Sequence, residues 1–501
     1  MASLVALIIF IAIAISQAVA TTDDVILEIG ISNESQGKNL TELTMQQISL
    51  AIPYFSDNGE IRRMINNTDA YNTLALSALK CCQELLPLAI DNLNRSLSTD
   101  VTKGGLMSMT CAAGTNMQTC VEGFEDQPQV MFESVYNKLK YPIDLNRGIT
   151  KIMARSNNKS DLLKKDSDYP GWLSDGDRNL LLADSKINAD VVVAKDGSGK
   201  YKRISDAVKN APRFSKTRYV IYVKSGVYNE NVNIGSDRWN VMMFGDGMEK
   251  TIISSNRSHG AGLMTYDTPT FAVRGEGFMA RDIKFANTAG AINGQAVALL
   301  SDSDRSVFYR CSMDGYQDTL CANSKRQFYR ECEIYGTIDL IFGSAAVVIQ
   351  KSSIFVRKPV PGQDNVITAH GETDSQCQTG IVVQTSTIQA SENLKGVSTF
   401  LGRPWKPYAT SVFMQNNFND LIDPRGWRPW NTTPGAKPTP DTVFLAEYEN
   451  RGNSAMTTGR VKWKGVKTSL SFAEASGFTV GSFIQGKDWL PATQVPYDLG
   501  L

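Results

Sequence analysis

The 501-residue sequence predicts an all-β solenoid preceded by an all-α helical region, and three observations support this arrangement. The stretch from Phe308 to Ile349 nearly repeats itself. Short β-branched and aromatic runs, broken by Gly, Asn and Asp, dominate from residue 189 onward. Before residue 160, apolar residues recur at a helical period instead. A chain of this length is expected to form two domains, each large enough to bury a core.

The near-repeat sets the expected geometry of the solenoid. Three features recur at 20, 21 and 21 residues: Phe308-Tyr309-Arg310 as Phe328-Tyr329-Arg330, Cys311 as Cys332, and Asp318 as Asp339. A period of this size is typical of a coil whose successive turns stack on one another. Stacked strands lie about 4.8 Å apart, so we expect Asp318 and Asp339 one above the other on the same face.

Two carboxylates at that separation cannot both ionise freely, so one is expected to act as an acid while the other remains an anion. Asp residues in solenoids often cap turns, but recurrence one coil apart favours a catalytic role for Asp318 and Asp339. Cys311 and Cys332 are expected to form an interior stack of small side chains. The sequence does not decide whether these two cysteines form a disulfide.

Composition narrows the possible chemistry. Lys plus Arg and Asp plus Glu each number 51, so no nucleic-acid partner is expected. The two histidines, His259 and His370, are too few to favour a Ser-His-Asp triad or a histidine-built metal site. We therefore expect neither a metal nor another cofactor, and carboxylates should carry the proton chemistry.

The N-terminal segment, residues 1–20, is an apolar run that ends in Ala18-Val19-Ala20. This pattern predicts a signal peptide, although the basic start is missing and an uncleaved anchor stays open. Glycosylation sequons are consistent with an exported, secreted glycoprotein, and they begin at Asn33, Asn39, Asn66, Asn94, Asn158, Asn256 and Asn431.

Residues 21–160 are predicted to form a helical bundle. The clearest stripe comprises Leu79, Cys82, Leu86, Ile90, Leu93 and Leu97, with a kink expected at Pro87. Of the cysteines in this region (Cys81, Cys82, Cys111 and Cys120), Cys82 and Cys120 are a plausible disulfide, but sequence leaves the connectivity open.

Residues 161–188 read as an exposed linker with a possible processing site, because they combine mixed charge with Pro and Gly and show no periodicity. Residues 189–501 contain the β-rich runs, for example 219–223 and 241–244. Their coil-like spacing favours a β-helix over a sandwich.

The β-rich part resembles the plant pectin methylesterases (pectinesterases) that carry an inhibitor-like pro-region. The resemblance rests on five ordered motifs: Gly226-Val227-Tyr228-Asn229-Glu230, Gly294-Gln295-Ala296-Val297-Ala298-Leu299, Gly315-Tyr316-Gln317-Asp318-Thr319-Leu320, Gly336-Thr337-Ile338-Asp339-Leu340-Ile341-Phe342-Gly343 and Leu401-Gly402-Arg403-Pro404-Trp405. It covers residues 190–501. A weaker match to the pro-region involves Cys82-x-Glu84-Leu85-Leu86 and residues 119–124.

The resemblance implies a right-handed parallel β-helix that hydrolyses methyl esters of homogalacturonan, the backbone of pectin, in the cell wall. It also implies a long open cleft, a pro-region that acts as an intramolecular inhibitor, and a monomer without cofactors.

The resemblance also assigns roles to residues. Asp339 would be the nucleophile, and Asp318 would be first the acid and then the base. Gln295 and Gln317 would donate hydrogen bonds to the oxyanion, and Arg403 would orient Asp339 and keep it ionised. Residues expected to bind the sugar are Trp405, Trp427, Phe271, Gln295 and Arg403. An ester hydrolase needs this set of nucleophile, oxyanion donors and proton donor.

The chain departs from the family pattern at several positions. Leu340 stands in place of a usual Phe, Cys321 of a Tyr, Ser352 of a Cys and His370 of a Gln. The early cysteine pair of the pro-region is absent, and the usual basic processing motif is reduced to Asp177-Arg178-Asn179-Leu180.

Two other functions remain open at this point. A pectate lyase or polygalacturonase on the same architecture would cut the polymer, using a calcium site or carboxylates that flank a glycosidic bond. The second alternative is a β-helix that has lost catalytic activity, in a protein that only binds or inhibits. For single residues, Gln295 and Gln317 could form an amide ladder, Arg403 a surface ion pair, and Trp405 part of the core.

Overall fold

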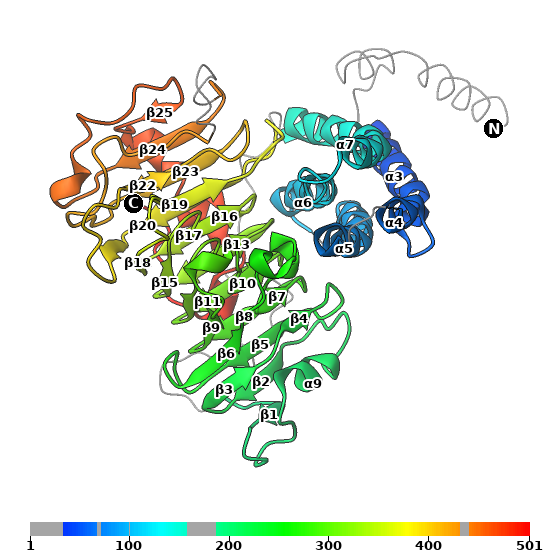
Figure 1. Cartoon of the computed structure of the whole chain (residues 1–501), viewed down its shortest axis with the longest axis horizontal. Coiled ribbons are helices and arrows are strands. Elements are labelled where there is room, and N and C mark those ends of the chain that lie inside the picture. Colours follow the sequence, from blue (N-terminus) through cyan, green and yellow to red (C-terminus); the bar gives the residue numbers. More distant parts are fainter. Residues whose placement is uncertain (1–33, 68–71, 100, 158–186, 431–439) are drawn as a thin grey trace.

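The computed structural model describes residues 34–67, 72–99, 101–157, 187–430 and 440–501. The signal segment, the linker as far as residue 186, and the sequons at Asn33, Asn158 and Asn431 lie outside the described residues. The described part consists of a helical bundle and a β-coil that lie side by side (Figure 1).

Helices before residue 158 form an up-and-down bundle. The helices are α3 (Glu34–Ala51), α4 (Glu60–Asn66), α5 (Thr73–Arg95), α6 (Lys103–Glu122) and α7 (Gln129–Asn157), with a 3₁₀ turn, η1, at Ile52–Phe55. Leu79, Cys82, Leu86 and Leu93 are buried along α5, as the stripe predicts, and the helix continues through Pro87. The expected disulfide Cys82–Cys120 joins α5 to α6. By length and composition alone α5 could cross a membrane, but 56% of its apolar window is buried inside the protein.

The remainder of the chain forms the predicted right-handed parallel β-helix, with three parallel sheets. Sheet 1 contains β1 (Val191–Val193), β2 (Tyr219–Val223), β5 (Val241–Phe244), β8 (Met279–Arg281), β11 (Ser306–Tyr309), β14 (Arg326–Arg330), β17 (Ala346–Gln350), β20 (Gly380–Gln384), β23 (Thr410–Met414), β24 (Phe444–Tyr448) and β25 (Val466–Lys467). Sheet 2 contains β3 (Gly226–Asn229), β6 (Thr251–Ser255), β9 (Lys284–Asn287), β12 (Ser312–Asp314), β15 (Glu333–Gly336), β18 (Ser353–Val356) and β21 (Thr387–Ala390). Sheet 3 contains β4 (Val232–Ile234), β7 (Phe271–Val273), β10 (Leu299–Ser301), β13 (Leu320–Ala322), β16 (Ile341–Gly343), β19 (Asn365–His370) and β22 (Thr399–Gly402).

The structure corrects one detail of the repeat. Phe308 pairs with Tyr329 rather than with Phe328, so the coil offset is 21 residues here, and the 20-residue spacing of the Phe-Tyr-Arg triplet is not the register. Because alternate side chains in a strand point to opposite faces, the slip puts Phe308 inside the coil and Phe328 outside. The rings of Phe308 and Tyr329 stack inside the coil, with centroids 4.7 Å apart.

The corner between sheets 1 and 2 explains why the sequence repeats. Its first residue is left-handed in every coil from β8 to β24: Asp282, Arg310, Glu331, Lys351, Thr385, Gln415 and Glu449. After Asp282 comes Ile283, and each later corner has a small or amide side chain second: Cys311, Cys332, Ser352, Ser386, Asn416 or Asn450. Cys311 and Cys332 are buried and not disulfide-bonded, as expected for an interior stack. The Ser352 hydroxyl, one coil on, accepts a hydrogen bond from the Cys332 N–H at 3.1 Å.

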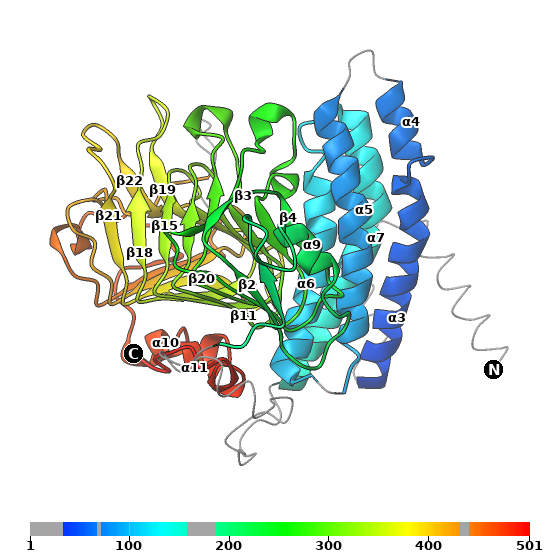
Figure 2. The ribbon, with the colours of Figure 1, turned by 90° about the horizontal axis from the view of Figure 1, so that it is seen from below.

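Short helices cover the first coils and one side of the β-helix. Helix α9 (Ile204–Lys209) buries Ile204, Ala207 and Val208 in the first coils. The C-terminal helices α10 (Phe472–Ser476) and α11 (Val480–Phe483) pack on the outer face of sheet 1 (Figure 2). Both devices cover apolar surface that the coil would otherwise expose to water.

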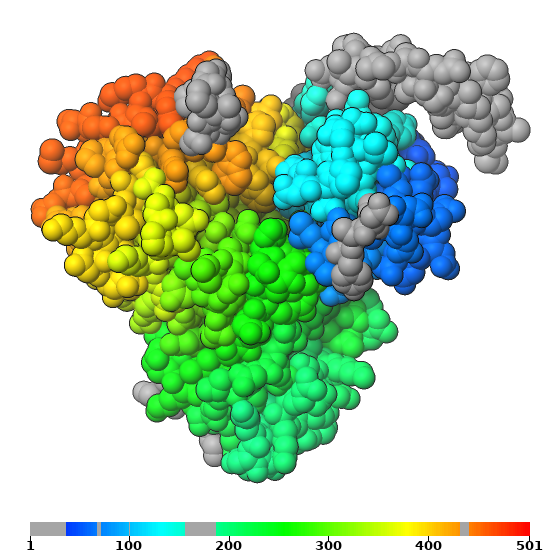
Figure 3. All heavy atoms as spheres, in the orientation of Figure 1, coloured from blue at the N-terminus to red at the C-terminus, as the bar shows by residue number. Residues whose placement is uncertain are grey.

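The helical bundle packs against sheet 3. Figure 2 shows the long helices standing along one flank of the coil, and Figure 3 shows the two parts in direct contact. The outward-facing residues Leu300, Cys321 and Phe342, on β10, β13 and β16, belong to the same buried apolar cluster as the bundle core. The bundle therefore covers the face on which the two aspartates were predicted to lie.

The cysteine arrangement predicts a specific thiol count. All eight cysteines lie in the described part, four as the disulfides Cys82–Cys120 and Cys111–Cys377 and four as buried thiols. Denatured but unreduced protein should therefore titrate four thiols per chain, and eight after reduction, in a spectrophotometric thiol assay. Two thiols before reduction would contradict the unbonded Cys311 and Cys332, and six would mean that one disulfide is absent.

Candidate active site

Asp318 and Asp339 occupy equivalent positions in consecutive coils. Each stands two residues before a sheet 3 residue, Leu320 or Ile341, and these two residues are register partners. The Asp318 N–H donates to the Ile338 carbonyl at 2.9 Å, one residue before Asp339. The two carboxylates thus lie one coil apart, as the 21-residue spacing predicts.

The turns that hold these aspartates are tightly constrained. Asp318 and Asp339 have positive φ angles of 61° and 47°, a left-handed conformation that Asp adopts more readily than most residues. The Thr319 hydroxyl lies within hydrogen-bonding distance of the Tyr335 carbonyl, at 2.9 Å. A Cβ on Gly336 would come within 2.6 Å of that hydroxyl, so the glycine lets the second turn stack closely on the first.

Arg403 binds Asp339 through both carboxylate oxygens. Its Nε donates to Oδ1 at 2.8 Å and its terminal nitrogen to Oδ2 at 2.5 Å. Arg403 follows the last residue of β22, and its own N–H donates to the Thr368 carbonyl at 2.9 Å. A bidentate guanidinium pair fixes the orientation of the carboxylate. The structure thus brings together Asp339 and Arg403 as predicted.

Asp318 has a different environment. Its side chain is buried, and its Oδ1 atom has no hydrogen-bond partner among the described residues. Burial raises the pKa of Asp318 well above its ordinary value, the negative charge of Asp339 raises it further, and Arg403 partly opposes the rise. Burial and the neighbouring carboxylate therefore favour the protonated form of Asp318.

The two glutamines lie on neighbouring coils. Gln317 directly precedes Asp318, and Gln295 lies on the coil before it. The N–H of Ala296, the residue after Gln295, donates to the Gln317 carbonyl at 3.1 Å. Both glutamine side chains are partly exposed. In the described part of the chain, no hydrogen bond engages either side-chain amide, so we find no amide ladder there. Their N–H groups are available to a ligand.

Two predicted sugar-binding residues lie inside the coil. Phe271 packs in the aromatic core, 4.8 Å from Phe285 between ring centroids, because Ala272 is the residue of β7 that points outward. Trp427 is 1% exposed and packs on Phe413. The assignments of Phe271 and Trp427 to sugar binding are wrong for this conformation, because neither ring reaches the surface.

Trp405 and Trp430 line the outside of the coil instead. The Trp405 ring lies 6.3 Å from Phe342 and 6.2 Å from Trp430. The Arg403 guanidinium lies over the Trp430 ring at 4.2 Å, and the Trp430 side chain is 40% exposed. The sequence analysis missed Trp430, although the pair of tryptophans three residues apart in Gly426-Trp427-Arg428-Pro429-Trp430 could have indicated one inward and one outward ring.

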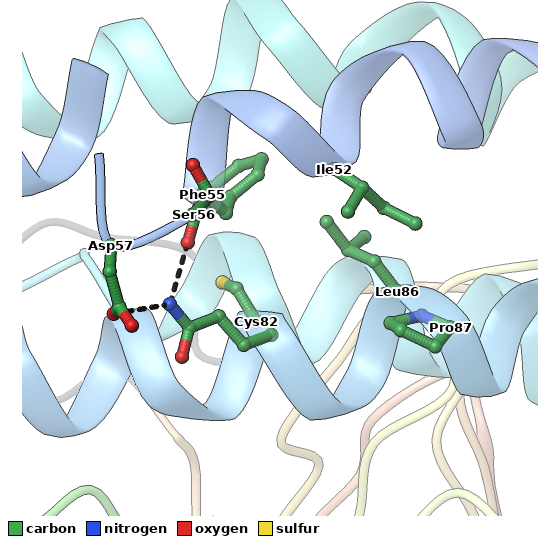
Figure 4. Close-up of a pocket in the computed structure, with 8 residues that line it drawn as sticks. Ile52, Phe55, Ser56, Asp57, Cys82, Leu86 and Pro87 are labelled. Atoms are coloured by element: carbon green, nitrogen blue, oxygen red, sulfur yellow. Dashed lines mark hydrogen bonds between the residues drawn. The ribbon is translucent and has the colours of Figure 1, made fainter. Parts of the chain in front are cut away.

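No group of three or more His, Cys, Asp or Glu side chains suited to a metal ion occurs among the residues that the structure describes. A groove lies in the helical bundle between η1 and α5, lined by Ile52, Phe55, Cys82, Leu86 and Pro87 among others (Figure 4). Its polar contact is Gln83, which donates to the Phe55 carbonyl and to Asp57. None of the predicted catalytic residues lines this groove.

Polar contacts fasten the bundle over the site. Lys406, next to Trp405, pairs with Glu122 of α6 at 2.5 Å. Asp267 accepts from Lys80 at 2.8 Å and from Ser77 at 3.2 Å, both on α5. Arg274 pairs with Glu84 and Arg95 with Glu276, at 3.3 and 3.1 Å. Together with the apolar cluster, these contacts hold the helices against the outer face of sheet 3.

A disulfide that the sequence analysis did not predict, Cys111–Cys377, joins the two parts of the protein. Cys111 belongs to α6, and Cys377 to the loop that follows β19. In that loop Glu372 accepts hydrogen bonds from Thr373 and Asp374, and burial raises the pKa of Glu372 to about 7.

Sequence models of two known families match this chain. The family described as pectinesterase matches residues 190–487, and that described as plant invertase/pectin methylesterase inhibitor matches residues 30–156. The first match covers the β-helix, and the second covers the bundle.

Similar proteins carry the same names. A probable pectinesterase/pectinesterase inhibitor of Arabidopsis thaliana is 41% identical over 483 residues, which cover 93% of this chain and 83% of the relative. A pectinesterase of Citrus sinensis is 43% identical, over 85% of this chain and 82% of the relative. The structure of pectin methylesterase from carrot is 49% identical, with a TM-score of 0.61, over 63% of this chain and 99% of that one. A pectin methylesterase in complex with a hexasaccharide is 26% identical, with a TM-score of 0.53, over 62% of this chain and 100% of that one.

The different positions of the two tryptophans predict different effects of substitution. Trp427→Ala should lower the free energy of unfolding by roughly 3–5 kcal/mol, because it empties a core site. Trp430→Ala should cost about 1 kcal/mol or less, since it removes an exposed ring and one cation–π contact. Urea denaturation of the two variants measures this difference. Equal losses would contradict the inward and outward assignment.

Proposed function

The chain belongs to the pectinesterase family and is a carboxylic ester hydrolase acting on methyl-esterified pectin, and we propose that Asp339 and Asp318 perform this hydrolysis. The observation that carries the proposal is the asymmetry of the pair. Arg403 holds Asp339 in a bidentate pair, whereas Asp318 is buried with an unpartnered oxygen and a raised pKa. One carboxyl group is therefore prepared to attack, and the other to donate a proton.

In the first half-reaction, a carboxylate oxygen of Asp339 attacks the carbonyl carbon of the methyl ester. The negative charge that develops on the carbonyl oxygen accepts hydrogen bonds from the side-chain amides of Gln295 and Gln317. Protonated Asp318 transfers its proton to the departing methoxide, so methanol leaves and an acyl-enzyme anhydride on Asp339 remains.

In the second half-reaction, Asp318 is a carboxylate and takes a proton from a water molecule. The resulting hydroxide attacks the carbonyl carbon of the substrate acyl group, and the bond to the Asp339 oxygen breaks. The products are a galacturonic acid group, ionised Asp339 still paired with Arg403, and protonated Asp318. The galacturonic acid group then loses its proton to bulk water and becomes a carboxylate. No redox step or cofactor is needed for this balance.

The substrate we infer is homogalacturonan that carries methyl esters. Trp405 and Trp430 offer apolar ring faces beside Arg403, the kind of surface on which sugar rings stack. Sheet 3 continues for several coils on either side of the aspartates, which suits an extended polymer rather than a small ester.

We also infer that the helical half inhibits the β-helix within the same chain. Its helices bury the outward residues of β10, β13 and β16, and its ion pairs reach Lys406, next to Trp405. A polymer and these helices cannot occupy that face together. We place the inhibitor-like half at residues 21–160 and the catalytic half at residues 189–501. We also propose that the protein is a monomer.

Secretion to the cell wall as a glycoprotein is the localisation we propose. The sequon asparagines Asn39, Asn66, Asn94 and Asn256 are exposed, so a glycan could be attached at each without disturbing the core. The two disulfides are typical of proteins from an oxidising compartment.

Replacing the nucleophile tests the catalytic proposal. In a truncated protein spanning residues 184–501, Asp339→Asn should lower methanol release from highly esterified pectin by roughly 10³-fold or more, because an amide cannot form the acyl-enzyme. Asp318→Asn should lower it by about 10²- to 10⁴-fold through loss of the acid and base. Polymer length should stay unchanged.

Asp282→Asn is the matched control. Asp282 has a positive φ of 58° and a bidentate arginine partner, Arg310, but it lies at the corner between sheets 1 and 2. Its substitution should leave methanol release near that of the unchanged protein. Undiminished release from Asp339→Asn would refute the proposed nucleophile, and shortening of the polymer would point to a lyase or polygalacturonase.

Separated halves test the inhibition. Residues 21–160, added to residues 184–501, should slow methanol release, whereas the same segment with Glu122→Lys should slow it less because it repels Lys406. Glu133→Lys on the exposed face of α7 is the matched control and should inhibit normally. If the unchanged helical segment has no effect at micromolar concentration, the inhibition proposal fails.

A further inference from the structure

Cys111 and Cys377 are 266 residues apart in sequence and connect the helical half to the catalytic half. The chain connection between the halves runs through residues 158–186, so the disulfide is a second covalent connection, independent of that peptide. Cleavage of the peptide connection alone would leave one molecule made of two linked chains.

The loop that carries Cys377 is firmly held at the edge of the outer face of sheet 3. Gly371, at the start of this loop, packs under the Trp405 ring. Glu372 accepts hydrogen bonds from the N–H groups of Thr373 and Asp374 at 2.9 and 2.8 Å, and Thr379 donates to its other oxygen at 2.9 Å. The loop therefore cannot swing far with the helical half, and the disulfide ties that half to a rigid point beside Trp405.

A second helix contacts the same loop. Thr150 of α7 donates to the Asp374 carboxylate at 2.6 Å, while Cys111 of α6 forms the disulfide. Two helices of the bundle are thus attached within a few residues of each other, and the covalent bond lies next to the noncovalent contacts that it would preserve.

The disulfide keeps a small exposed fraction, 7% at Cys111 and 9% at Cys377. It borders a small hollow whose wall includes Gly114, Thr115, Asn146, Glu372 and both half-cystines. Cys82–Cys120, by comparison, joins two helices within the bundle core, where both sulfurs are fully buried. The connection between the halves is the more accessible of the two disulfides.

We propose that Cys111–Cys377 is a reducible latch. It keeps the helical half on the outer face of sheet 3 after the peptide connection has been cut. Release then requires a dithiol reductant as well as proteolysis. One reductant thiolate attacks a sulfur of the disulfide, and the mixed disulfide is resolved by the second thiolate. Two electrons and two protons pass to Cys111 and Cys377, and the reductant becomes a cyclic disulfide.

The latch rests on the proposed inhibition. Its physical effect is to raise the effective concentration of the helical bundle at the site. A bundle tethered by the disulfide faces the site at about millimolar effective concentration, whatever the protein concentration. A cut and untethered bundle binds as a separate molecule, so dilution from about 10 μM to about 10 nM would let it dissociate if its Kd lies between these values.

The test uses the full-length protein with a protease recognition sequence placed within residues 161–183. After cleavage, the unchanged protein should remain one species on a non-reducing gel and separate into two on a reducing gel. Its methanol release should stay low on dilution and rise at least about tenfold after treatment with dithiothreitol. Cleaved Cys377→Ser, which keeps Cys82–Cys120, should separate without reductant and become active on dilution.

Cys332→Ser is the matched control, because Ser352 and Ser386 already occupy the equivalent corner positions of later coils. It should behave as the unchanged protein in every arm. Two chains on the non-reducing gel for the unchanged protein, or a cleaved Cys377→Ser protein that stays inactive on dilution, would overturn the latch. Residues 184–501 alone, assayed in parallel, report failure of the proposed catalysis separately, since they contain no helical half.

Discussion

The parallel hydrogen-bond register of sheet 3 is the constraint on which the rest of this structure depends. Leu320 pairs with Ile341, and this register places Asp318 and Asp339 one coil apart. Backbone bonds such as that from Asp318 to Ile338 leave the turns little freedom, and the left-handed conformation of both aspartates is sustained by the stacked coils around them. The chemical asymmetry of the pair then follows from one further residue, since Arg403 reaches Asp339 and leaves Asp318 unpaired.

The outer face of sheet 3 carries the contact with the helical bundle, and under the proposed function it would also bind the substrate. Leu300, Cys321 and Phe342 supply apolar surface along the coil, and in this conformation the helical bundle buries that surface. Under the proposed function, a polymer would meet Trp405 and Trp430 on the same face. An apolar strip beside the proposed catalytic groups is therefore hidden from water in this conformation.

Several features of the site were predictable because they are local or periodic. The 21-residue recurrence of Asp318 and Asp339 indicated their stacking, and the heptad-like spacing along α5 indicated the buried position of Cys82. The Phe-Tyr-Arg triplet suggested the wrong pairing. The same three residue types recur after 20 residues, whereas the strands pair with an offset of 21 residues. Phe271 and Trp427 were misplaced for a related reason: whether a ring in a strand or turn points inward depends on a shift of one residue, which the motif does not record.

The sequence by itself determined the solenoid, the carboxylate pair, the small residues of the corner and the helical nature of the first part, because each leaves a regular spacing in the chain. The tertiary structure decided which face of the coil the helices cover, that Trp430 rather than Trp427 lies beside Arg403, and that Cys111 bonds to Cys377. These outcomes depend on how two separately folded surfaces meet. Residues 266 positions apart carry no shared period from which such a meeting could be read.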